Sequence, residues 1–175
     1  MVSVRKTVKS KLIIFNLLKP IVMRRFFAIT ICLSLSVSLS AQEAKPEDVK
    51  SADAILTALY DVISGPAGGK RDWDRMKSLF IPEGRLMPTG KGQNGVGYRL
   101  WTVQEYIDEA GAGLEKNGFF EVEISRKIEA YGTIAHVFST YESRNILDDK
   151  EPFARGINSI QLLNGGDRWW IVSVF

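Results

Sequence analysis

Four strand-like segments fill the last third of the chain. They read FFEVEISRKIEA (119–130), TIAHVFSTYESR (133–144), RGINSIQLL (155–163) and RWWIVSVF (168–175). The joints between them are Tyr131-Gly132, a polar loop from Ile146 to Ala154, and Asn164–Asp167. Strand-forming runs joined by short turns predict an antiparallel meander, and this sheet decides the fold.

The preceding part of the chain reads as three helices. An apolar stripe follows Pro46 and runs to Ile63, where Gly65-Pro66 ends it. Asp72 caps a second, shorter helix, and Thr102 and Glu105 form a capping box at the start of a third helix that ends at Asn117-Gly118. Helices followed by a meander predict an α+β domain with its helices on one face of the sheet.

The turn assigns residues to the two faces of the sheet. If Tyr131-Gly132 is a two-residue turn, one face carries Val122, Ile124, Arg126, Ile128, Ala135, Val137, Ser139 and Tyr141. The opposite face then carries His136 together with Glu121, Glu123, Lys127, Phe138, Thr140 and Glu142. We expect the first set to face the core. The last two segments are apolar on both faces, which predicts an outer cover such as a partner subunit, or a sheet bent around a cavity.

The amino terminus carries the positive charge of the chain. Residues 1–41 hold seven basic and no acidic residues, which leaves 16 basic and 20 acidic residues in the remainder, a net charge of −4. A net negative charge over residues 42–175 does not favour nucleic-acid binding. Residues 23–41 have the form of a signal peptide, because Met23-Arg24-Arg25 precedes a short apolar run and small residues. We expect residues 1–22 to lie upstream of the true start, residues 46–175 to form the domain, and the product to be periplasmic or secreted without a stable membrane anchor.

Cysteine and histidine are each used once. Cys32 lies within the signal segment, and Ile31 before it does not suit a lipoprotein signal. The exported part would then have no disulfide and no thiolate. With a single histidine, His136, we expect no metal site and no cofactor.

The glycine-rich segment Pro88–Gly97 predicts an exposed loop. Its sequence TGKGQNGVG lacks the spacing of a phosphate-binding P-loop and does not stand between a strand and a helix.

Taken together, several strings resemble the nuclear transport factor 2-like superfamily, especially its polyketide-cyclase-like and ketosteroid-isomerase-like branch. They are DWDRMKSLFIPEGRLM (72–87), WTVQEYIDEA (101–110), GTIAHVFSTYESR (132–144) and RGINSIQLLNGGDRWWIVSVF (155–175). The resemblance implies a cone in which a curved antiparallel sheet packs on three helices and encloses a pocket, and it implies a homodimer formed through the sheet. The family includes isomerases, dehydratases, cyclases and members that only bind, so the fold does not assign a reaction.

Two residues are candidates for catalysis. His136 titrates near neutral pH, and Tyr141 could supply a phenol beside it or beside an aspartate. The alternative for His136 is a structural role on the face away from the pocket. Asp72 and Asp74 are more simply a helix cap and a first-turn charge.

Ligand contacts are expected from aromatic residues and from polar residues within apolar strands. These are Tyr60, Trp73, Trp101, Tyr106, Arg126, Arg155 and Asn158. Arg155 could instead pair with Asp148, Asp149 or Glu151. The leading hypothesis is an exported domain that binds a small, mostly apolar molecule without a catalytic set. The alternatives are an isomerase-, dehydratase- or cyclase-type enzyme, and an interaction module that dimerises through its sheet.

Overall fold

A computed structural model describes residues 43–93 and 95–175. The expected upstream extension, the signal segment and Cys32 lie outside these ranges. Within them, no helix is long and apolar enough to span a bilayer. The helices are α3 (Pro46–Val49), α4 (Ala52–Ile63), α5 (Trp73–Leu79) and α6 (Val103–Asn117). The strands are β1 (Phe80–Leu86), β2 (Thr89–Gly92), β3 (Gly95–Tyr98), β4 (Trp101–Thr102), β5 (Phe120–Tyr131), β6 (Ile134–Arg144), β7 (Ala154–Asn164) and β8 (Trp169–Val174).

The predicted meander β5–β6–β7–β8 is confirmed, within a six-stranded curved sheet of order β4-β1-β8-β7-β6-β5. The sheet is mixed, however, and not antiparallel throughout. Strand β1 pairs in parallel with β8, with Leu86 opposite Val174. This pairing joins segments almost ninety residues apart and covers the edge that β8 would otherwise expose.

The first predicted helix is broken into α3 and α4. Ser51 has an extended backbone, and its side chain accepts a hydrogen bond from the Ala54 amide at 3.0 Å. A serine hydroxyl that satisfies a free amide starts a new helix, so the continuous helix predicted from Pro46 was wrong. The caps predicted at Asp72 and at Thr102–Glu105 are confirmed.

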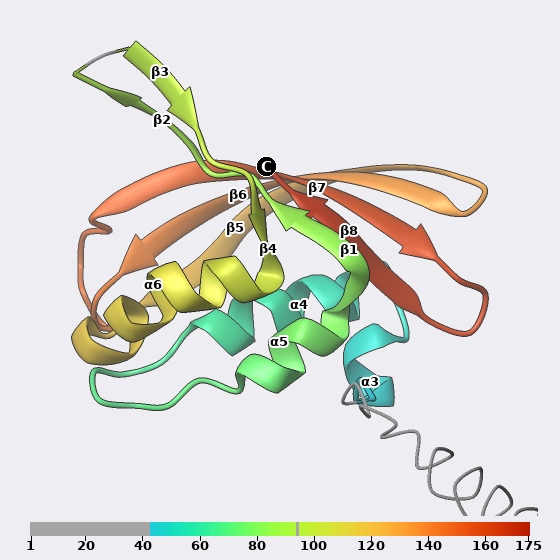
Figure 1. Cartoon of the computed structure of the whole chain (residues 1–175), viewed down its shortest axis with the longest axis horizontal. Helices are drawn as coiled ribbons and strands as arrows, with labels where there is room; N and C mark the ends of the chain where they lie inside the picture. Colours follow the sequence, from blue (N-terminus) through green and yellow to red (C-terminus); the bar gives the residue numbers. More distant parts are fainter. Residues whose placement is uncertain (1–42, 94) are drawn as a thin grey trace, which may run out of the picture. The chain divides into compact units, whose positions relative to one another are not determined.

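The core lies between the helices and the inner face of the sheet. Figure 1 shows α4, α5 and α6 gathered on the same side of the spread of strands. Helix α4 buries Ile55, Leu56 and Leu59. The sheet contributes Ala135, Val137, Ile160, Leu162 and Ile171 to the same apolar cluster. Burying each large aliphatic side chain contributes about 2 kcal/mol, so this contact stabilises the domain.

A bulge changes the register of β5 against β6. The turn is Gly132-Thr133, because Tyr131 pairs with Ile134, and the ladder is interrupted between Glu123 and Ser125. Ile124 is the extra residue, and an extra residue reverses which face the rest of the strand presents. Arg126 and Ile128 share the inner face with Val137 and Ser139 as predicted. The placement of Val122 and Ile124 there was wrong, because Val122 stands opposite Glu142 on the outer face and Ile124 is the bulged residue. Glu121 and Glu123 point inward instead.

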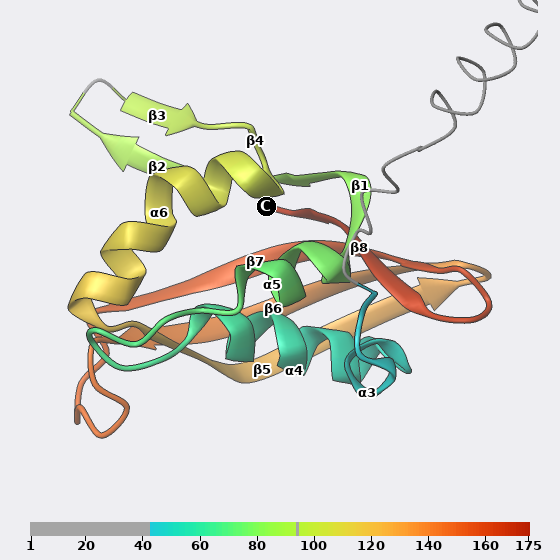
Figure 2. The same ribbon diagram turned by 60° about the horizontal axis from the view of Figure 1, so that its bottom comes forward.

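The segment after Pro88 is exposed, as predicted, but it is a β-hairpin and not a loop. Strands β2 and β3 pair only with each other, and all their described residues are exposed. Figures 1 and 2 show the hairpin projecting away from the helices and the main sheet.

Candidate functional site

A cavity of about 190 Å³ lies between the helices and the inner face of the sheet. Its lining residues are Leu59, Ile63, Met76, Leu86, Met87, Pro88, Tyr106, Glu121, Asn158, Val174 and Phe175. Most of the wall is apolar, and Glu121, Asn158 and Tyr106 supply its polar groups. Pro88 and Phe175 are exposed, so we take them as the mouth of the cavity.

Glu121 is the one carboxyl among these lining residues. It lies near the start of β5, and the bulge at Ile124 sets its inward direction. The Asn158 amide Nδ2 donates to Glu121 Oε1 at 3.1 Å, and the Ser143 hydroxyl donates to Oε2 over a long 3.4 Å. Burial raises the pKa of Glu121 to about 7, because these two hydrogen bonds only partly replace the water that the charged form loses.

Three tyrosines surround this carboxyl from different elements. Burial is the main cause that raises the pKa of Tyr60 (on α4) to about 12 and the pKa values of Tyr106 (on α6) and Tyr141 (on β6) above their usual range. The field of Glu121 acts in the same direction on each of them. The phenols are therefore neutral hydrogen-bonding groups at all ordinary pH values.

Tyr106 differs from Tyr60 in its bonding. No described residue forms a hydrogen bond with the Tyr106 hydroxyl, and the ring packs edge-on to Trp101 with centroids 6.2 Å apart. The Tyr60 hydroxyl, in contrast, lies 2.6 Å from Ser139 Oγ and 3.2 Å from Asn158 Nδ2. Tyr106 is thus the phenol with hydrogen-bonding capacity left for a molecule in the cavity.

A chain of polar contacts runs from the cavity toward the surface. The Ser139 hydroxyl donates to Glu123 Oε1, and the other oxygen of Glu123 pairs with the Arg126 guanidinium. Arg126 also pairs with the exposed Asp53 on α4 at 2.5 Å. Arg126 is therefore held in place by two carboxylates and does not line the cavity.

The two candidate catalytic residues lie apart. His136 is on the outer face, where its Nε2 lies 2.9 Å from Ser159 Oγ and its ring packs edge-on against Phe138. Tyr141 is on the inner face, directly over Gly156, where a Cβ atom would come within 2.4 Å of the phenol oxygen. Asp72 caps α5, and Asp74 pairs with Lys77 on the same helix, so neither aspartate lies at the cavity.

Of the seven residues expected to contact a ligand, Tyr106 and Asn158 line the cavity and Tyr60 adjoins it through Asn158. Trp73 packs against Gly111, and its indole N–H donates to Glu115 at 3.0 Å. Arg155 pairs with Glu142 on the neighbouring strand. The bridge expected from Arg155 to Asp148, Asp149 or Glu151 was therefore wrong.

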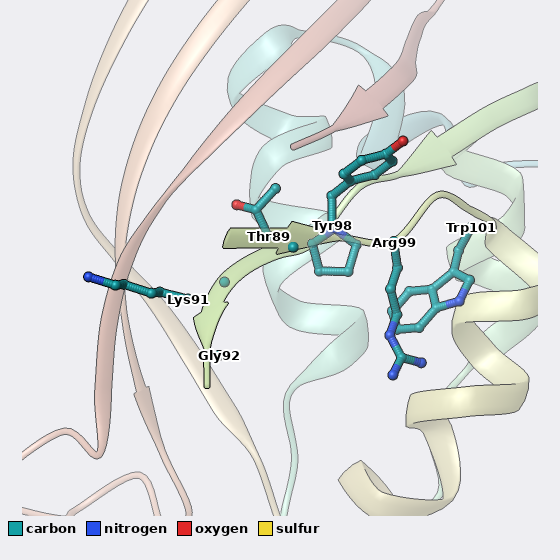
Figure 3. Close-up of a pocket in the computed structure, with 9 residues that line it drawn as sticks. Thr89, Lys91, Gly92, Tyr98, Arg99 and Trp101 are labelled. Carbon is teal, nitrogen blue, oxygen red and sulfur yellow. The ribbon is translucent and has the colours of Figure 1, made fainter. Parts of the chain in front are cut away.

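A second hollow, of about 440 Å³, lies beside the hairpin. It is lined by Lys91, Tyr98, Arg99 and Trp101 among others, and the Arg99 guanidinium stands 5.5 Å from the centre of the Trp101 ring. Figure 3 shows the Lys91, Tyr98 and Arg99 side chains pointing in three different directions. They do not converge on one molecule, so we place the candidate site at Glu121.

Glu121 was missed in the sequence because strict alternation put it on the outer face. Nothing in FFEVEISRK marks Ile124 as a bulge, since the bulged residue is an ordinary strand former. The described residues contain no group of three or more side chains arranged to hold a metal ion. What the arrangement offers chemically is a carboxyl that can gain or lose a proton near neutral pH in an apolar cavity.

No family model and no curated protein matches the chain. Among solved structures, it is similar to a protein of unknown function with a cystatin-like fold from Nostoc punctiforme PCC 73102. That match has 14% identity and a TM-score of 0.50, over 71% of this chain and 90% of that one. Weaker likenesses are to the Kfla4162 protein of Kribbella flavida (11% identity, TM-score 0.45, over 69% and 82%) and to a provisionally assigned ketosteroid isomerase of Shewanella frigidimarina NCIMB 400 (14%, 0.40, over 59% and 79%). The first of these likenesses shows that the chain has a cystatin-like α+β fold, which is also the fold of the nuclear transport factor 2-like proteins.

Proposed function

We propose that this domain binds a small, neutral, mostly apolar molecule in the cavity that ends at Glu121. The proposal rests on two polar groups in the wall of one cavity. They are the largely buried Glu121 carboxyl and the Tyr106 phenol, which has no hydrogen-bond partner among the described residues. A mostly apolar pocket with a few polar groups is the usual form of a small-molecule site.

The size of the cavity limits the ligand. A cavity of about 150 Å³ is large enough to hold benzene. At about 190 Å³, this cavity suits a single ring with one or two substituents. The ligand would place its ring against Leu59, Ile63 and Val174 and one oxygen near Tyr106 and Glu121.

The alternative function is an isomerase or lyase that acts on a molecule of this size. The burial of Glu121 in the cavity favours it: burial raises the pKa of this carboxyl to about 7, and a general acid or base works best near the ambient pH. In this form of the alternative, Glu121 takes the role first considered for His136.

We also propose that the protein is exported and acts as a homodimer. Export rests on the segment 23–41. The proposal of a dimer is supported by the outer face of the sheet, where Phe138 is 47% and Ile157 is 55% exposed. A second copy of the chain would cover these apolar side chains. Sequencing the amino terminus of the secreted product tests the first, and solution mass measurement at high concentration tests the second.

The binding experiment uses native mass spectrometry for co-purifying molecules, followed by phenol and cyclohexanone as defined probes. Amide shifts in NMR spectra should centre on the cavity residues, with dissociation constants of about 1 mM for ligands of this size. Benzoate should bind more weakly at pH 8 than the neutral probes do, because its carboxylate would be repelled by the ionised Glu121. Ile63→Phe, which fills the cavity, should abolish binding, and Ile157→Phe on the outer face should not. Absence of any cavity shift with either probe, with no co-purifying molecule, would sink the proposal.

A further inference from the structure

We propose that Glu123 is a positioning residue that fixes the direction of every hydrogen bond between itself and Glu121, so that Asn158 presents an N–H donor to the cavity carboxyl. The inference deepens the proposed function, on which the importance of Glu121 rests. Its test uses ligand-free protein. The inference about Glu123 can therefore fail while the domain still binds a ligand, and ligand binding can fail while the inference holds.

The residues involved form a row across three strands. In the strand register, Arg126 on β5 stands opposite Ser139 on β6, and Ser139 stands opposite Asn158 on β7. Their side chains all point to the inner face, where the Tyr60 hydroxyl of α4 contacts Ser139 and Asn158. The row leads from the ion pair of Glu123 and Arg126 to Glu121.

The direction of each bond follows from the number of protons available. Glu123, paired with a guanidinium, is a carboxylate that only accepts, so the single hydroxyl proton of Ser139 goes to it. Ser139 then has only lone pairs for Tyr60, and the Tyr60 hydroxyl must donate across the 2.6 Å contact. The Tyr60 oxygen accepts from one N–H of Asn158, and the second N–H of that amide goes to Glu121 Oε1.

The bulge at Ile124 makes the ion pair possible. Residues three apart in a regular strand point to opposite faces, yet Glu123 and Arg126 both point inward because the extra residue lies between them. The half-buried Glu123 carboxylate is thereby held beside Ser139. Asp53, from α4, holds the other side of the guanidinium.

The consequence of neutralising Glu123 is specific. In Glu123→Gln, Arg126 still offers only donors, so the new amide must turn its oxygen to Arg126 and its NH₂ to Ser139. Ser139 then donates to Tyr60, and Tyr60 donates toward Asn158. Asn158 satisfies that donor by turning its oxygen to Tyr60 and Glu121, and Glu121 must hold a proton to bond with it.

The charged and titratable groups that face Glu121 are few. They are Tyr60 from α4, Tyr106 from α6, Tyr141 from β6, and the ion pair of Glu123 and Arg126 from β5. In Glu123→Gln the negative charge of Glu123 is lost and the positive charge of Arg126 stays. Removing a negative charge nearby would, through space alone, make Glu121 easier to ionise. The reversal of the hydrogen bonds makes it harder, so the two explanations differ in the sign of the effect.

The test is a ¹³C NMR titration of the Glu121 carboxyl in the ligand-free wild type and in Glu123→Gln. We expect the midpoint to move up by at least half a pH unit in the variant. An unchanged or lower midpoint overturns the inference.

Two further variants serve as an independent test and as a control. Ser139→Ala removes the link while keeping the charge of Glu123, so it should also raise the midpoint, and it decides the matter if Glu123→Gln does not fold. Asp53→Asn leaves the bond between Glu123 and Ser139 in place and should not move the midpoint. A rise with Asp53→Asn equal to that with Glu123→Gln would show that any disturbance of the ion pair suffices, and would overturn the inference.

Discussion

Asn158 Nδ2 lies 3.1 Å from Glu121 Oε1, although the two residues belong to strands β7 and β5 with β6 between them. The contact is possible because both side chains rise from the inner face. The β6 residues opposite them, Ser143 opposite Glu121 and Ser139 opposite Asn158, are small and buried. Glu121 thus receives a donor that is itself tied to Tyr60. These hydrogen bonds hold the Glu121 carboxyl in a mostly apolar cavity.

The stability of the domain should fall as pH rises toward 7. In the unfolded chain Glu121 titrates near its usual value of 4.5, and in the folded domain burial raises its pKa to about 7. Between these values the folded state binds more protons than the unfolded state, so the free energy of unfolding decreases with rising pH. The difference is about 3 kcal/mol, present below pH 4.5 and lost above pH 7.

Glu121→Gln should remove this dependence. Urea unfolding at pH 8 should show the variant more stable than wild type by up to about 3 kcal/mol, and the two should be alike at pH 4. Glu109→Gln, an exposed change on α6, is the control. Equal curves for wild type and Glu121→Gln across this range would show that Glu121 is solvated.

Tyr106→Phe should separate binding from stability. The hydroxyl has no partner among the described residues, so its removal should change the free energy of unfolding by less than about 0.5 kcal/mol. Binding of phenol or cyclohexanone should weaken about tenfold, which corresponds to one lost hydrogen bond. Equal affinity of both proteins for the probes would place the ligand oxygen elsewhere.

Arg71 should be important for folding and not for binding. Its buried guanidinium donates to the carbonyls of Ile63, Gly65, Gly69 and Leu114, and so ties the loop after α4 to α6. Arg71→Met leaves these acceptors unsatisfied and should destabilise the domain by about 3 kcal/mol in urea. Lys70→Ala, at a side chain that is 89% exposed, should leave the unfolding midpoint where it is.

His136 should not be needed at the cavity. It lies on the outer face against Phe138 and Ser159. His136→Gln should therefore leave both the Glu121 midpoint and probe binding unchanged by NMR. A loss of binding with an unchanged fold would return His136 to the list of functional residues.

Local patterns were enough for much of the fold. The apolar stripes, the caps at Asp72 and Thr102 and the four strands of the meander are visible in the sequence because each depends on neighbours within a few residues. The parallel pair of β1 and β8 depends on residues far apart and has no local pattern. Ser51 is a residue type that caps helices, and its cap at α4 divides the apolar stripe after Pro46 into two helices.

The candidate site was less predictable for a physical reason. Tyr106 and Asn158 stand out as polar or amphipathic groups among apolar residues, and both line the cavity. Glu121 depends on the bulge at Ile124, which reverses the faces of half a strand without a glycine or proline to mark it. A single unmarked residue therefore decides whether the central carboxyl faces the solvent or the cavity.

The most direct test of the account is the ¹³C titration of the Glu121 carboxyl with and without cyclohexanone. We predict a midpoint near 7 in the free protein, and a higher midpoint with the probe, because a neutral ring displaces water from the carboxyl and its oxygen accepts a hydrogen bond from the protonated form. A midpoint near 4.5, or one that does not move at saturating probe, would contradict the claim that Glu121 is the polar end of a ligand cavity.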